Sequence, residues 1–126
     1  DSINIVKSSF NLNYVDIENT FSDGLDSDFS SGAVTNSTFS NIGGDALDFS
    51  GSEVLIEKNT VNDVRDKAVS AGEYSKVNIK NININESPIG MVSKDGSKLT
   101  LDDAFVFNAK VCIAAYSKKK VMVGAK

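Results

Sequence analysis

VLIEKNTVNDVRDKAVSAGEYSK, residues 54–76, contains three short β-forming segments joined by polar turns. Residues 54–56 alternate like a strand with one buried face, a second segment points Val61 inward, and residues 68–71 form a third. The connecting segments are too short to be helices, and no stretch of the chain combines a sustained helical period with helix caps. The stretch therefore predicts three short strands per unit and little or no helix.

Similar side chains return every 22 residues along the chain, which indicates one supersecondary unit stacked on copies of itself. We therefore expect an all-β, parallel β-helix solenoid in which each strand pairs with its copy one coil away, about 4.8 Å along the axis. An antiparallel sandwich gives no reason for such a period. Four columns carry it: large apolar (Ile3, Leu25, Leu47, Val69, Met91, Ile113), small (Gly24, Ala46, Ala68, Gly90, Cys112), apolar (Ile17, Phe39, Val61, Phe105, with Ile82 or Ile84 in place of Asn83 after a local slip) and short polar (Asn19, Asn41, Asp63, Asn85).

The short polar column predicts a sharp bend in every coil. Asn and Asp tolerate the left-handed backbone conformation that such a bend requires. Their stacked amides can also hydrogen-bond along the axis, and Asn59 with Asn81 predicts a second, shorter ladder of this kind. The small column has two interpretations: an outward-facing flat strip that could receive a ligand, or a tight corner where larger side chains would clash, which we favour.

Composition bounds the class of protein. The chain has 126 residues, a net charge of −4, one Cys, one Pro and no His or Trp. The negative charge argues against a nucleic-acid partner, and residues 118–120, three lysines, are expected to form a solvated turn. Cys112 is expected to replace a buried or half-buried alanine. No apolar run is long enough to span a membrane, and we expect residues 1–126 to be one β-helix segment cut from a longer protein.

The stretch VTNSTFSNIGGDALDFS, residues 34–50, resembles the repeats of right-handed parallel β-helices of the pectate-lyase-like superfold. It is similar in particular to β-helix regions of bacterial surface proteins, some of which are joined to spore-coat-H-like kinase domains. The resemblance covers essentially the whole chain. It implies a right-handed solenoid and an extracellular or cell-surface location in bacteria, but it does not select an activity, because this superfold carries many.

Acidic residues from two neighbouring coils form the candidate metal site. Stacking places Asp26 over Asp48, and Asp23 over Asp45, at about 5 Å. Carboxylates this close repel unless a cation, a hydrogen bond or a raised pKa relieves them. Calcium suits such a site because it takes several oxygen ligands in a flexible geometry. The alternative is that these aspartates form turns and accept hydrogen bonds from nearby backbone amides; Asp28 and Glu53 extend the acidic stretch.

Polysaccharide lyases of this superfold resemble that arrangement, with calcium on stacked acids and an Arg or Lys as the proton-abstracting base. Arg65 and Lys67 are the best candidates for that role here. The chain departs from those enzymes in having few coils, no long loops to wall a cleft and no signature of alginate epimerases. Arg65 as a solvent-facing partner of Asp63 or Asp66 is the structural alternative.

Glycan binding without catalysis would need exposed aromatic side chains in one place. Tyr14, Tyr74 and Tyr116 fall in different columns of the 22-residue period and predict no such platform. Phe29 lies outside the core register but is a single side chain.

The preferred hypothesis is a non-catalytic extracellular or cell-surface module that acts as spacer, adhesin or glycan-contact scaffold, with no catalytic residue and no cofactor. The alternative is a fragment of a calcium-assisted polysaccharide lyase or related enzyme. A third hypothesis is self-association, since open strand edges invite pairing. The expected partners are accordingly a polysaccharide or another protein chain meeting the ends of the solenoid.

Overall fold

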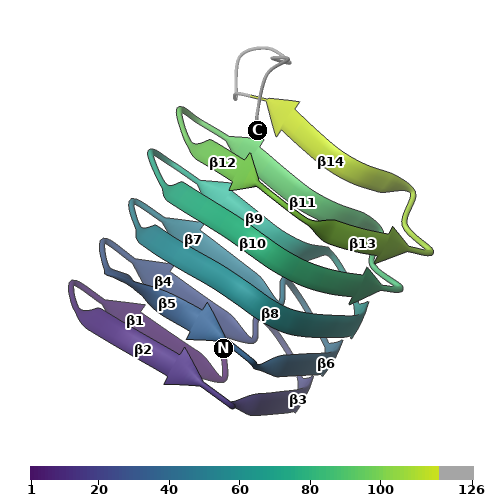
Figure 1. Cartoon of the computed structure of the whole chain (residues 1–126). Coiled ribbons are helices and arrows are strands. Elements are labelled where there is room, and N and C mark those ends of the chain that lie inside the picture. Colours follow the sequence, from purple (N-terminus) through teal and green to yellow (C-terminus); the bar gives the residue numbers. More distant parts are fainter. Residues whose placement is uncertain (117–126) are drawn as a thin grey trace.

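The computed structural model describes residues 1–116, which form a coil of parallel strands and no helix. Successive coils lie on one another from β1 to β14, as Figure 1 shows. Because these residues contain no helix, none that could cross a membrane is present among them. The lysine run at 118–120 lies outside the described residues.

Two sheets make up the coil, and all their strand pairs are parallel. The first sheet has six strands in the order β1 (Ile3–Val6), β4 (Leu25–Asp28), β7 (Leu47–Ser50), β9 (Lys67–Gly72), β11 (Ile89–Lys94) and β14 (Val111–Tyr116). The second contains β2 (Ser9–Asn13), β5 (Ser31–Thr35), β8 (Glu53–Val64), β10 (Lys76–Asn85) and β12 (Lys98–Leu101), with β3 (Asp16–Thr20), β6 (Thr38–Ile42) and β13 (Ala104–Phe107) beside them.

Three strands per coil are present where β1–β3 and β4–β6 follow one another. In the middle coils the second and third strands merge into one long strand, β8 or β10, which curves round the bend (Figure 1). The prediction of a parallel solenoid with three short strands per coil is therefore confirmed, with this fusion as a local variation.

The large apolar column is confirmed along the whole first sheet. Each member pairs with the next, from Ile3 with Leu25 to Met91 with Ile113. The four central members are fully buried, and Phe39 and Phe49 fill the interior beside them. Burial of these side chains is the main stabilising term of the fold, since each contributes about 1.5–3 kcal/mol.

The period departs from 22 residues in one coil. Val54 pairs with Val77 and Ile56 with Ile79, a step of 23, whereas Lys67 pairs with Ile89 at a step of 22. One residue is therefore added in the turn before β10 and removed in the turn after it. The slip changes which residues of later coils face inward.

The slip corrects the third column. Ile84 pairs with Val61, as the predicted local slip allowed, and Val106 pairs with Ile84 in the next coil. Phe105 was wrongly placed in this column: it pairs with Asn83 and is 58% exposed.

The predicted left-handed bend is confirmed at Asn19, Asn41 and Asp63, whose φ values are 59°, 52° and 61°. The Asn41 side chain donates to Asn19 Oδ1 at 2.6 Å. Asn85 was wrongly placed, because the slip gives the bend to Glu86, with φ 58°.

Amide stacking continues next to the bend. Asn85 donates to Asn62, each one residue before the bend of its coil, and Asn108, which lies at the bend with φ 54°, donates to Asn85. The second predicted ladder is absent from the described coils. Asn59 pairs with Ile82 rather than Asn81, which instead donates to Asp103.

The small column forms the tight corner that we favoured. Ala46 and Ala68 are fully buried. A Cβ on Gly24 would lie 2.8 Å from the Ala46 carbonyl oxygen and 3.2 Å from the Phe39 ring, so only glycine fits. Cys112 departs from its prediction and is exposed, because it lies in β14 at the end of the described sheet.

Candidate functional site

The structure brings the four predicted aspartates together on the first sheet and the turns that precede it. Asp23 and Asp45 lie in the turns before β4 and β7, and Asp48 lies in β7. One oxygen from each of these three carboxylates lies within 4.8 Å of the others. Asp26 pairs with Asp48 and belongs to a second group with Asp1 and Asp23. We call Asp23, Asp26, Asp45 and Asp48 the acidic patch.

Two of these carboxylates hold the turn together. The Asp45 N–H donates to Asp23 Oδ1 at 2.8 Å, and the Lys67 N–H donates to Asp45 Oδ1 at 3.0 Å. Each aspartate thus satisfies a backbone donor of the next coil. These bonds match the turn-forming interpretation of the sequence.

Burial raises the pKa of the carboxyl groups in the patch. The pKa of Asp45 rises to about 6, mainly through burial, although the Lys67 ammonium opposes the rise. The pKa of Asp48 rises to about 7 through burial, the charge of Asp45 and a hydrogen bond with Asp23. Burial and the charges of Asp28 and Asp23 raise the pKa of Asp26 as well. At neutral pH the carboxyl groups of the patch are therefore partly protonated, unless a bound cation compensates their charge.

An oxygen-only donor set fits calcium better than softer metals. Ser70 pairs with Asp48 in the neighbouring strand and is fully buried, and its Oγ has no hydrogen-bond partner. It adds an unsatisfied oxygen at the position paired with Asp48. Asp23, Asp45 and Asp48 are the residues that would hold the ion.

Lys67 lies at the edge of the patch but is engaged in ion pairs. Its Nζ is 2.8 Å from Asp66 Oδ2 and 3.4 Å from Asp45 Oδ1. Burial lowers the pKa of Lys67, but the contacts with Asp66 and Asp45 outweigh it, so the net shift is upward. A lysine that abstracts protons needs a lowered pKa, so this arrangement does not favour the role of a base.

Arg65 lies in the turn between β8 and β9. It borders a shallow cavity of about 400 Å³ together with Phe21, Asn41 and Gly43. Within the described coils it forms no ion pair with Asp63 or Asp66, contrary to the structural alternative. Glu53 does not belong to the acidic patch, since it begins β8 in the second sheet.

A second site follows the corner between the two sheets, and the sequence did not predict it. Five residues occupy the same corner position in successive coils. The N–H of each of the first four donates to the carbonyl oxygen of the residue that precedes the next member. Four of them have a left-handed φ between 50° and 57°, and the last has φ 77°. They are Lys7, Phe29, Gly51, Tyr74 and Gly96, which we call the corner row.

The corner row places two aromatic rings on the surface with a glycine after each. Phe29 is 65% exposed and Tyr74 is 80% exposed. A Cβ on Gly51 would lie 2.6 Å from the Phe29 ring, and a Cβ on Gly96 would lie 2.8 Å from the Tyr74 ring. Each ring therefore packs against the glycine of the next coil, and a larger residue there would displace it.

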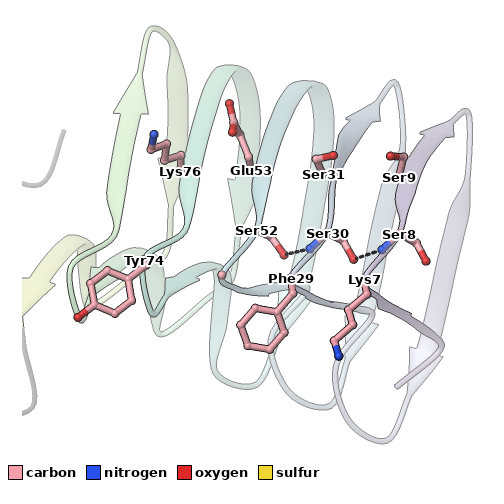
Figure 2. A pocket seen from close by; sticks show the side chains of 11 residues that line it. Lys7, Ser8, Ser9, Phe29, Ser30, Ser31, Ser52, Glu53, Tyr74 and Lys76 are labelled. Carbon is pink, nitrogen blue, oxygen red and sulfur yellow. Dashed lines mark hydrogen bonds between the residues drawn. The ribbon is translucent and has the colours of Figure 1, made fainter.

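A groove of about 510 Å³ runs along this corner. Figure 2 shows Lys7, Phe29 and Tyr74 projecting along one side of it. The other side is a row of paired positions in the second sheet: Ser9, Ser31, Glu53 and Lys76.

Serines between the two sides hold the groove in shape. The Ser8 N–H donates to Ser30 Oγ at 3.0 Å, Ser30 N–H to Ser52 Oγ at 3.2 Å, and Ser52 N–H to Ser75 Oγ at 3.1 Å. The first two bonds are drawn in Figure 2. This serine ladder ties each coil to the next directly beneath the corner row.

A strict step of 22 residues hides the corner row. Two steps from Phe29 lead to Glu73, whereas the residue added in this coil puts Tyr74 in the row. The sequence does contain the signal. Ser52, Val54 and Ile56 recur as Ser75, Val77 and Ile79, a step of 23.

Comparison with known proteins identifies the family but not the activity. No curated protein and no solved structure matches the chain significantly. The family model described as a right-handed beta helix region matches residues 1–124. The chain therefore belongs to the right-handed β-helix family.

Proposed function

We propose that this chain is a non-catalytic β-helix module of the bacterial surface or extracellular space that contacts glycans through the corner groove. The observation that carries the proposal is the exposure of Phe29 and Tyr74 in one row, over a floor of serines. The C–H faces of sugar rings pack on aromatic side chains, while hydroxyl and charged groups at the edges fix their orientation.

The groove has features of binding rather than of hydrolysis. Glu53 is the one acid among the residues that line it. Glycoside hydrolysis ordinarily uses two carboxyl groups facing each other across the scissile bond. The two rings are also largely exposed, as is usual for a surface that a long ligand contacts.

Affinity electrophoresis in gels containing soluble polysaccharides tests this function. The proposal predicts that at least one polysaccharide retards the protein, and that Phe29→Ala or Tyr74→Ala weakens the retardation at least tenfold. Tyr14→Ala is the matched control, since Tyr14 is 77% exposed, has a left-handed φ of 57° and lies outside the groove. Equal losses in all three variants, or retention unaffected by either groove variant, would refute the role of the groove.

The acidic patch supports a second candidate function, calcium binding. Three carboxylates with oxygens within 4.8 Å of one another are the specific observation. An ion that binds only the folded state raises the unfolding temperature. Thermal melting at increasing calcium should show such a rise for the unaltered chain and not for Asp48→Asn, with exposed Asp16→Asn as control. An unchanged melting temperature at millimolar calcium would remove this site.

The lyase alternative requires more than the ion. It predicts unsaturated product absorbance when the calcium-loaded protein is incubated with polyuronates. Contact with another protein chain through the ends of the solenoid stays a prediction, to be checked by the oligomeric state in solution.

A further inference from the structure

Resting on the proposed glycan contact, we propose that the ligand class is a neutral, extended glycan of β-linked sugar rings that lies parallel to the solenoid axis. Phe29 and Tyr74 would each contact one sugar ring, with one further sugar ring between them.

The repeat of the coil sets the orientation. Phe29 and Tyr74 are separated by two coils of the same row, with Gly51 in the coil between. Two strand spacings amount to roughly 10 Å. In an extended β-linked chain, two successive rings span close to this distance, and every second ring presents the same face to the same side. A chain laid along the row therefore brings equivalent ring faces to both aromatics.

Gly51 leaves room for the Phe29 ring, as Gly96 does for the Tyr74 ring. The Gly51 φ of 57° and the 2.6 Å approach of a Cβ to the Phe29 ring exclude other residues without strain. The Phe29 ring thus lies on the coil of Gly51 and the Tyr74 ring on the coil of Gly96. Both rings are displaced by one coil in the same direction, so they stay two coils apart and leave one coil between them for the middle sugar. A coiled α-linked chain curves away from a straight row and would meet one aromatic at a time.

The groove carries charges of both signs. Its lining has Lys7 on the side of the aromatic rings and, on the other side, Glu53 between Ser31 and Lys76 (Figure 2). A polymer with a negative charge on every ring would be repelled by Glu53 as well as attracted by Lys7 and Lys76. Hydroxyl groups can bond to charges of either sign, so we take the ligand to be uncharged. Ser9 and Ser31, exposed on the opposite side from Phe29, offer further hydrogen bonds to the edge of the chain.

Isothermal titration with oligosaccharides of defined linkage and length tests this inference. The ligands are cello-, xylo-, manno- and chito-oligosaccharides of two to six rings, with malto-oligosaccharides as the α-linked set and oligogalacturonates as the anionic set. We expect one or more β-linked neutral series to bind, with an affinity gain of at least tenfold between two and four rings. Tyr74→Ala should abolish that gain with length while Tyr14→Ala preserves it.

The outcomes separate the two proposals. The inference is overturned if the α-linked or anionic series binds as strongly as the β-linked series, or if affinity does not rise with oligosaccharide length. If Phe29→Ala nevertheless weakens binding, the groove is still upheld as a glycan site. If no oligosaccharide binds and no polysaccharide retards the protein, both proposals fail. If the double variant Phe29→Ala, Tyr74→Ala still binds these sugars, the glycan site lies outside the corner groove and both proposals fail.

Discussion

At the scale of single residues, the left-handed bends explain why short polar side chains recur. Asn41 has φ 52° and bonds to Asn19 across the coil. We predict that Asn41→Ala lowers the free energy of unfolding by about 1–2 kcal/mol, because a Cβ residue without a local hydrogen bond is strained there. Asn41→Gly should lower the free energy of unfolding by less. Urea unfolding of both variants measures these two losses of stability. Asn11→Ala, at an exposed strand position, is the neutral control. Equal losses in Asn41→Ala and Asn41→Gly would contradict this account.

The pH dependence of stability follows from Asp48 and Asp45. Their pKa values in the folded chain, about 7 and about 6, exceed the ordinary 3.8, so the folded state binds protons more tightly than the unfolded state. Stability is then highest below the unfolded pKa and falls as pH rises from about 4 through 7. With calcium chelated, we predict that the unfolding free energy decreases by about 1–3 kcal/mol between pH 5 and pH 8.

Asp48→Asn should remove most of this decrease and raise the melting temperature at pH 8. Exposed Asp16→Asn is the control, and should keep the dependence of the unaltered chain. A stability that increases with pH over this window would contradict the shifts described for the acidic patch.

At the scale of elements, the serine ladder fastens the turns between the first and second sheets. Ser52 is 2% exposed, its Oγ accepts the Ser30 N–H, and it bonds also to Ser27. Ser52→Ala leaves the buried Ser30 N–H without its partner, which costs about 1–3 kcal/mol. Chemical denaturation should show this loss, and exposed Ser9→Ala should change stability by less than about 0.5 kcal/mol. Equal effects of the two substitutions would refute the ladder.

The strands and their pairing could be predicted because the fold repeats. The apolar side chain of Leu47 packs between similar side chains at Leu25 and Val69, so the 22-residue period can be recognised in the sequence. The added residue could not be found by a fixed step, and it misplaced Phe105 and Asn85 and hid the partnership of Phe29 with Tyr74.

The candidate sites also contain features that the sequence predicts and features that it does not. The acidic patch was predicted because its members lie within two coils of constant spacing. The ion pairs of Lys67 and the inward position of the small column depend on how the turns bend. Alternation along a strand does not determine that bend, so these features required the structure.

At the scale of the whole molecule, the solenoid should tolerate loss of a complete coil but not of a fraction. Its free energy of unfolding is approximately the sum of the contributions of the single coils and of the interfaces between neighbouring coils. Deleting residues 31–52 removes one coil and lets Glu53 stack on Ser9. We predict that circular dichroism keeps its β spectrum with a lower melting temperature. Deletion of residues 31–41, half a coil, should abolish the cooperative transition; a cooperative transition there would contradict stacking in register.

The corner groove is most directly tested by NMR titration of the labelled chain with the six-ring sugars of the β-linked series. The account predicts that amide shifts concentrate at residues 7–9, 29–31, 51–53 and 74–76, a line parallel to the axis. Perturbation centred on the acidic patch, or none with any of these sugars, would contradict it.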